Sequence, residues 1–287
     1  MADSDSDSAV SFVFYRYQPS MAAAVIFIIL FAISSLVHIY MLVRKRTWYF
    51  IPFVIGCLFE TVGYIGRALS SPEYPSFTKN PYIIQSVLLL LGPTLYAASI
   101  YMVLGRLVVH LDADSYSLIK PKWLTKFFVL GDVISFFAQG GGGGLLTQAK
   151  SLDDVRRGEN IIVGGLGVQI LFFGFFMIVT FVFHRRISGK PTHAALTLKT
   201  PWRKLLIVLY VSSSLIMVRS IYRVAEYVLG SDGELQSKEV YLYILDALPM
   251  FLVAISYNVF HPSRVVSREA KEQLESVTSL DVLGGNR

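Results

Sequence analysis

The feature of this sequence that most constrains its fold is a series of long apolar segments separated by short polar stretches. A helix rises about 1.5 Å per residue, so segments of roughly 20 to 28 residues can each cross a hydrocarbon core about 30 Å thick. Strands are disfavoured, because the apolar runs are continuous and a lone strand in lipid leaves its backbone unpaired. The sequence predicts an all-α integral membrane protein, a seven-transmembrane helix bundle. The predicted spans are residues 19–43, 48–69, 82–109, 123–147, 160–183, 202–229 and 239–260.

The composition excludes several classes of function. Of the 287 residues 54% are hydrophobic and 16% charged, whereas a soluble domain has about 25% charged residues. The net charge of +6 does not indicate nucleic-acid binding, because the lysines and arginines flank apolar segments instead of forming one basic face. The single cysteine, Cys57, excludes an internal disulfide and a cysteine metal cluster. No phosphate-binding loop motif occurs, so we expect no ATP hydrolysis, and we expect no metal or other cofactor.

The distribution of cations predicts the orientation of the chain. Lysines and arginines gather in the segments 44–46, 120–122 and 185–204 and in the tail after residue 263, and cation-rich loops face the cytoplasm. An odd number of spans then places the N-terminus outside and the C-terminus in the cytoplasm. We therefore expect an exterior tail at 1–18, a transmembrane domain at 19–262 and a cytoplasmic tail at 263–287.

Charged and amide side chains inside the predicted spans are the strongest functional signal. Such groups cost free energy in lipid unless they pair or face water, so each is a candidate for a functional site. With alternating span direction most fall in the outer half of the bilayer, and Glu60 and Asp132 fall nearer its middle. Together they predict a polar cavity for the head group of an amphipathic ligand. The candidate ligand-binding residues are Glu60, Arg67, Gln85, Asp132, Gln139, Gln169, Arg219, Arg223, Glu226 and Asp246.

Two interpretations of these polar residues compete. The near balance of acids and arginines indicates ion pairs, of which Glu60 with Arg67 is one, and such pairs can simply hold helices together. Two arginines one helical turn apart, Arg219 and Arg223, also suit an anionic group. For the glycine run 140–144 we expect a frayed helix end and a flexible loop, with close approach to a neighbouring helix as the alternative.

Five motifs in register resemble one known family. They are E-x-x-G-Y-x-G-R at 60–67, G-P-x-x-x-A-A-x-x-Y at 92–101 followed by Gly105-Arg106, D-x-x-S-x-x-x-Q-x-x-G-G at 132–143, R-S-x-Y-R-x-x-E at 219–226 and D-x-x-P-M at 246–250. From residue 15 to residue 264 the chain is similar to the fungal lipid-translocating exporter family, also called RTA-like proteins. The resemblance implies a seven-helix fungal protein of the plasma membrane. It also implies transport of sphingoid bases or sterol-like amphiphiles, drug resistance and, in one branch, porphyrin traffic.

The sequence leaves three functions open. The first is a carrier for a membrane lipid or another amphiphilic small molecule, coupled to protons if Glu60 or Asp132 takes one up. The second is a seven-helix receptor or lipid sensor, although span 7 lacks the N-P-x-x-Y motif. The third, an intramembrane enzyme, is disfavoured because His38 lies far in depth from the outer acids. Whether two copies form a homodimer also stays open.

Overall fold

The fold is a long bundle of helices. The computed structural model describes residues 15, 17–149, 151–197, 201–229 and 233–266. The longer helices are α1 (Met21–Lys45), α2 (Ile51–Ser70), α3 (Lys79–His110), α4 (Pro121–Gln148), α5 (Leu152–Gly189), α7 (Trp202–Val228) and α10 (Leu248–Val259). The shorter ones are α6 (His193–Thr197), α8 (Glu234–Ser237) and α9 (Glu239–Leu242), and the π-helical turn η4 (Tyr243–Ala247) joins α9 to α10. Short 3₁₀ turns occupy Trp48–Phe50, Ser71–Glu73, Asp114–Tyr116 and Pro262–Arg264.

Six of the described helical segments are long and apolar enough to cross a membrane. They are Met21–Lys45, Trp48–Glu73, Lys79–His110, Asp153–Gly189, Trp202–Val228 and Glu239–Arg264. The fourth predicted span, α4, has 28 residues but is not one of the six, and Asp132 and Gln139 make it more polar. An integral membrane protein is thus supported, while the count of seven spans and the orientation of the termini stay predictions.

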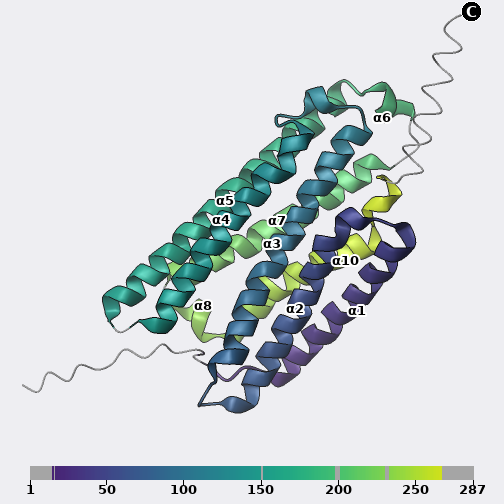
Figure 1. Cartoon of the computed structure of the whole chain (residues 1–287). Helices are drawn as coiled ribbons and strands as arrows, with labels where there is room; N and C mark the ends of the chain where they lie inside the picture. The colour runs from purple at the N-terminus through teal and green to yellow at the C-terminus, as the bar shows by residue number, and fades with distance from the viewer. Residues whose placement is uncertain (1–14, 16, 150, 198–200, 230–232, 267–287) are drawn as a thin grey trace, which may run out of the picture.

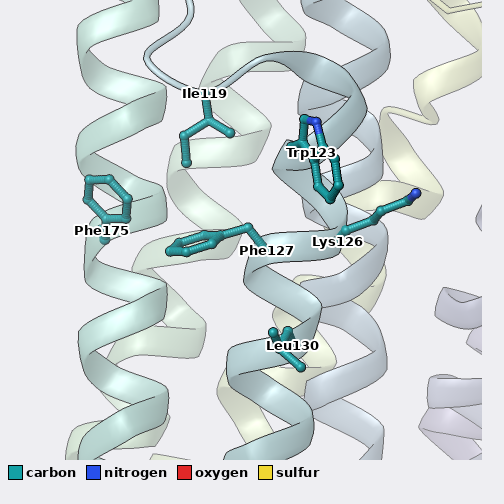
Figure 2. Close-up of a pocket in the computed structure, with 6 residues that line it drawn as sticks. All are labelled: Ile119, Trp123, Lys126, Phe127, Leu130 and Phe175. Carbon is teal, nitrogen blue, oxygen red and sulfur yellow. The ribbon is translucent and has the colours of Figure 1, made fainter.

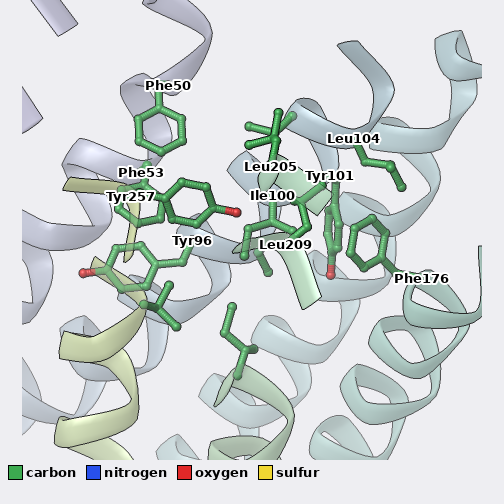
Figure 3. Close-up of a cluster of buried hydrophobic side chains, with 14 of the residues drawn as sticks. Phe50, Phe53, Tyr96, Ile100, Tyr101, Leu104, Phe176, Leu205, Leu209 and Tyr257 are labelled. Carbon is green, nitrogen blue, oxygen red and sulfur yellow. The ribbon is translucent and has the colours of Figure 1, made fainter. Parts of the chain in front are cut away.

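Helix α3 occupies the centre of the bundle and packs against α2, α4 and α7 (Figure 1). Aromatic rings fill the space around it, and Figure 3 shows Phe50, Phe53 and Tyr257 on one side of the cluster and Tyr101 with Phe176 on the other. Apolar side chains also cover the outside of the bundle, as a lipid-facing surface requires, and those of α1 are more than half exposed at Ile26, Ile33 and Leu36.

Two expectations about α4 and α5 were wrong. Instead of fraying, α4 continues through the glycine run, where Gly142 packs so closely on Gly158 that an added Cβ would lie 2.7 Å from the Gly158 carbonyl oxygen. The alternative of close helix approach is therefore correct at Gly142. Helix α5 begins at Leu152 rather than at residue 160, because Ser151 and Asp154 form a capping box.

Candidate functional site

One buried ion network lies between α7 and η4. Asp246 accepts a hydrogen bond from Arg219 Nε at 2.5 Å, and its other oxygen pairs with Arg223 Nη2. Arg223 Nη1 also bonds Glu226 Oε2 at 3.0 Å. The side chains of Arg219 and Asp246 are 1% and 4% exposed. Four of the predicted residues thus meet, and each arginine has a carboxylate partner.

Backbone irregularities in two helices shape this network. Pro93 lies inside α3 and has no N–H to donate to the carbonyl of Leu89, four residues earlier. That carbonyl instead accepts a hydrogen bond from Arg219 Nη2 at 2.8 Å. Asp246 belongs to the π-helical turn η4, a type of local widening that often occurs at functional sites. Pro93 of the G-P pair therefore has a physical role, because it leaves the Leu89 carbonyl free to accept a hydrogen bond from a buried arginine.

Arg67 is fully buried and has a different partner from the expected one. Its Nη2 lies 2.7 Å from Glu239 Oε1 and 2.9 Å from the Tyr17 hydroxyl, and its Nε bonds the Tyr243 hydroxyl at 3.1 Å. The expected pairing with Glu60 was wrong. The two residues are seven positions apart on one helix, which is roughly 10.5 Å along the axis. Arg67 Nη1 is buried and has no hydrogen-bond partner.

Tyrosine rings surround the Arg67 guanidinium. Its central carbon lies 5.4 to 5.7 Å from the ring centroids of Tyr15, Tyr17 and Tyr243, within the range of cation–π attraction. The sequence reasoning missed these rings and Glu239 as site residues. Glu239, Tyr243 and Asp246 follow i, i+4, i+7 spacing and so lie on one face of the last span. This spacing could have identified Glu239 and Tyr243 as neighbours of Asp246 in the site.

Glu60 is the acid of this region without an arginine partner. It is 2% exposed, and its Oε1 has no hydrogen-bond partner. It packs against Gly92 of α3, where an added Cβ would lie 2.8 Å from that oxygen. Arg219 and Asp246 are near enough to act on it electrostatically, although they bond each other. Glu60 is therefore a buried acceptor beside a network whose charges are already paired.

The segment before α1 covers this end of the bundle. The Tyr15 hydroxyl donates to Gln85 Oε1 at 2.7 Å, which accounts for that predicted residue. The Ser20 backbone N–H donates to Glu239 at 2.9 Å, and Ser71 Oγ donates to the Pro19 carbonyl at 2.7 Å. We call residues 15 and 17–20 the N-terminal strap, because they tie the starts of α1, α3 and α9 to the end of α2.

The remaining predicted residues form a second group on α4 and α5. Gln139 Nε2 bonds Ser135 Oγ at 2.6 Å and Gln169 Oε1 at 3.3 Å. Asp132 is 2% exposed, and neither of its oxygens has a hydrogen-bond partner. The Tyr101 hydroxyl is near enough to Asp132 to act on it electrostatically. It also has no partner within hydrogen-bond distance. Among the described residues no group of three or more His, Cys, Asp or Glu side chains could hold a metal ion.

Comparison with known proteins identifies the family. Residues 53–269 match the profile described as RTA1 like protein. The chain is 37% identical to Protein RTA1 of Saccharomyces cerevisiae, with 93% of this chain and 90% of the relative covered. It is 38% identical to Protoporphyrin uptake protein 1 of the same yeast, with 86% and 91% covered. It is 31% identical to the Probable lipid transporter atnI of Emericella nidulans, with 88% and 68% covered.

No solved structure matches the chain. The names of two of these relatives describe transport or uptake, which fits a protein that is not an enzyme. The match over 53–269 and the identities above confirm the resemblance that the five motifs indicate. The chain belongs to the RTA1-like protein family.

Proposed function

We propose that this protein is a carrier that moves a lipid or another amphiphile across the plasma membrane. The ligand's head group would bind beside Glu60, between α2, α3, α7 and η4, while its tail lies among the helices. A relative named as a probable lipid transporter supports this proposal. The observation that carries it is Glu60 itself, a buried acceptor without a hydrogen-bond partner for Oε1 beside a polar network.

The charge pattern favours a cationic head group. Arg67, Arg219 and Arg223 each have a carboxylate partner, so an anionic head group would compete with Glu239 or Asp246 for them. An ammonium group would instead give Glu60 the partner that it lacks, and buried charges are stable when they are paired. A long-chain amine of the sphingoid-base type has this chemistry.

A second candidate is uptake of an anionic amphiphile such as a porphyrin. Two buried arginine nitrogens, Arg67 Nη1 and Arg223 Nε, have no hydrogen-bond partner and could donate to a carboxylate. The relative named for protoporphyrin uptake supports this candidate. The two candidates differ in the residue that binds the ligand, so one set of variants separates them.

The test is transport in liposomes that contain the purified protein. A fluorescent long-chain amine and its N-acetylated, uncharged analogue are followed across the bilayer for the wild type, Glu60→Gln and the exposed control Glu234→Gln. A charge-assisted contact contributes about 1.5–3 kcal/mol to amine binding. Glu60→Gln should therefore raise the amine concentration that gives half-maximal transport by roughly 10- to 150-fold. The analogue and the control should show no such loss.

Three results would count against the proposal. If the wild type moves neither probe faster than empty liposomes, the chain is not a carrier for these amphiphiles, and the receptor alternative gains weight. If Glu60→Gln transports the amine normally, Glu60 does not bind the head group. If only a fluorescent porphyrin is moved and Arg223→Gln abolishes that movement, the anionic candidate is correct.

A further inference from the structure

A groove lies on the surface of α4 at the end of the bundle where the cation-rich loops gather. Its volume is about 570 Å³, within the range of ligand sites. Figure 2 shows Trp123, Phe127 and Leu130 following one another down α4, with Phe127 directed toward α5 and Lys126 extending from the opposite flank of α4. Ile119 and Phe175 complete its lining.

The groove is apolar and open to the surroundings of the bundle. Trp123 is 63% exposed, Leu130 is 57% exposed and Phe127 is 41% exposed. These residues follow i, i+4, i+7 spacing and so form one stripe on the outer face of α4. Helix α4 packs along α3 and α5, both long and apolar enough to cross a membrane, so the hollow apolar stripe on its outer face is placed to meet acyl chains.

A lysine at the rim adds charge to this apolar surface. Lys126 Nζ lies 5.3 Å from the Trp123 ring centroid, and no described carboxylate pairs with it. Lys122 is exposed one turn nearer the helix start. Tryptophan is typical of the membrane interface, and lysine side chains near helix ends reach toward the head groups. The groove thus has a cation on one flank of α4 and an apolar channel beside it.

We propose that this groove binds one anionic glycerophospholipid from the leaflet at the cation-rich end. The lipid phosphate lies at Lys126, and one acyl chain lies along Phe127 and Leu130. Lys126 is near the start of α4, whereas Arg223 and Asp246 lie at the opposite end of the bundle. This lipid is therefore a resident of the fold and is separate from the transported amphiphile of the proposed function.

Native mass spectrometry of the purified protein titrated with phosphatidylserine tests the proposal. The matched control for Lys126→Gln is Lys204→Gln, which removes an exposed lysine near the start of α7 at the same end of the bundle. One lysine near an anionic head group corresponds to about a fivefold change in binding. We expect that loss for Lys126→Gln and a change of less than about twofold for Lys204→Gln. Phosphatidylcholine should bind the wild type more weakly.

Two further measurements separate the groove from general surface charge. Leu130→Trp keeps every charge but fills the groove, and it should also weaken phosphatidylserine binding. Soluble glycerophosphoserine, which has the head group but no acyl chains, should neither bind nor compete. The proposal is overturned if Lys126→Gln binds like the wild type, if both lysine variants lose affinity equally, or if glycerophosphoserine competes fully. Each variant is checked for a monodisperse elution profile. The readout is lipid binding alone, so it does not depend on whether the protein transports an amphiphile.

Discussion

The change Asp246→Asn tests whether the buried network stabilises the bundle. Asparagine has the shape of aspartate but no charge, and its amide group presents N–H donors to arginine N–H donors. Breaking a buried ion pair costs about 3–5 kcal/mol. Arg219 keeps the Leu89 carbonyl and Arg223 keeps Glu226, so we expect the lower end of that range, about 3 kcal/mol.

The assay is SDS-induced unfolding of the purified protein, followed by the fluorescence of its three tryptophans. The matched control is Glu234→Gln, which removes the same kind of charge from a pair with Lys238 whose side chains are 64% and 57% exposed. That change should leave the unfolding free energy as it is. Adding Arg219→Gln to Asp246→Asn should recover part of the loss, because Asp246 is the carboxylate partner of Arg219 and its removal leaves that charge uncompensated.

A small effect of Asp246→Asn would refute this reasoning. If the unfolding free energy falls by less than about 1 kcal/mol, the buried pair behaves like an exposed one. The network would then not be a stability element, and its arginines would be available to a ligand. If Arg219→Gln makes the double variant additively worse, Asp246 and Arg219 are not coupled.

Two other predictions concern helix packing and the N-terminal strap. Gly142→Ala should destabilise the protein, because the added methyl group meets the Gly158 carbonyl oxygen at 2.7 Å, whereas Gly140→Ala has nothing within 4 Å and should stabilise by roughly 0.5–1 kcal/mol. Unfolding curves of the two variants check this, and equal curves would contradict the close packing. Tyr15→Phe removes the hydrogen bond to Gln85 and should loosen the strap without changing the bundle. Faster hydrogen exchange at residues 17–20 alone is the expected result, and unchanged exchange would show that the hydroxyl does not hold the strap.

The helices of this protein could be predicted from sequence because lipid imposes a simple condition on them. A continuous apolar run must satisfy its own backbone, so the positions of α1, α3 and α7 follow from hydropathy within a few residues. The start of α5 did not, because five of its first eight residues, 152–159, are charged and lower the hydropathy there. Its capping signal, Ser151 with Asp154, was present in the sequence.

The pairing of buried charges was harder to predict. Helical spacing places Glu60 and Arg67 on one face, but it does not tell which neighbouring helix supplies a partner. The actual partner of Arg67 is Glu239, 172 positions away, and that contact depends on how α2 and α9 pack. The acceptor role of the Leu89 carbonyl was hidden for another reason, since it depends on backbone that Pro93 leaves unpaired.

The N-terminal strap also has a consequence for the order in which the chain is assembled. The backbone N–H of Ser20 bonds the carboxylate of Glu239, 219 positions later. The strap residues leave the ribosome well before Glu239 is synthesised. The contact between Ser20 and Glu239 therefore forms after those of Tyr15 with Gln85 and Pro19 with Ser71, and until Glu239 arrives Arg67 is without the carboxylate that neutralises it. A chain truncated before α9 would leave Arg67 and the Ser20 N–H without their carboxylate, so biogenesis itself passes through a form with an unneutralised arginine at this end of the bundle.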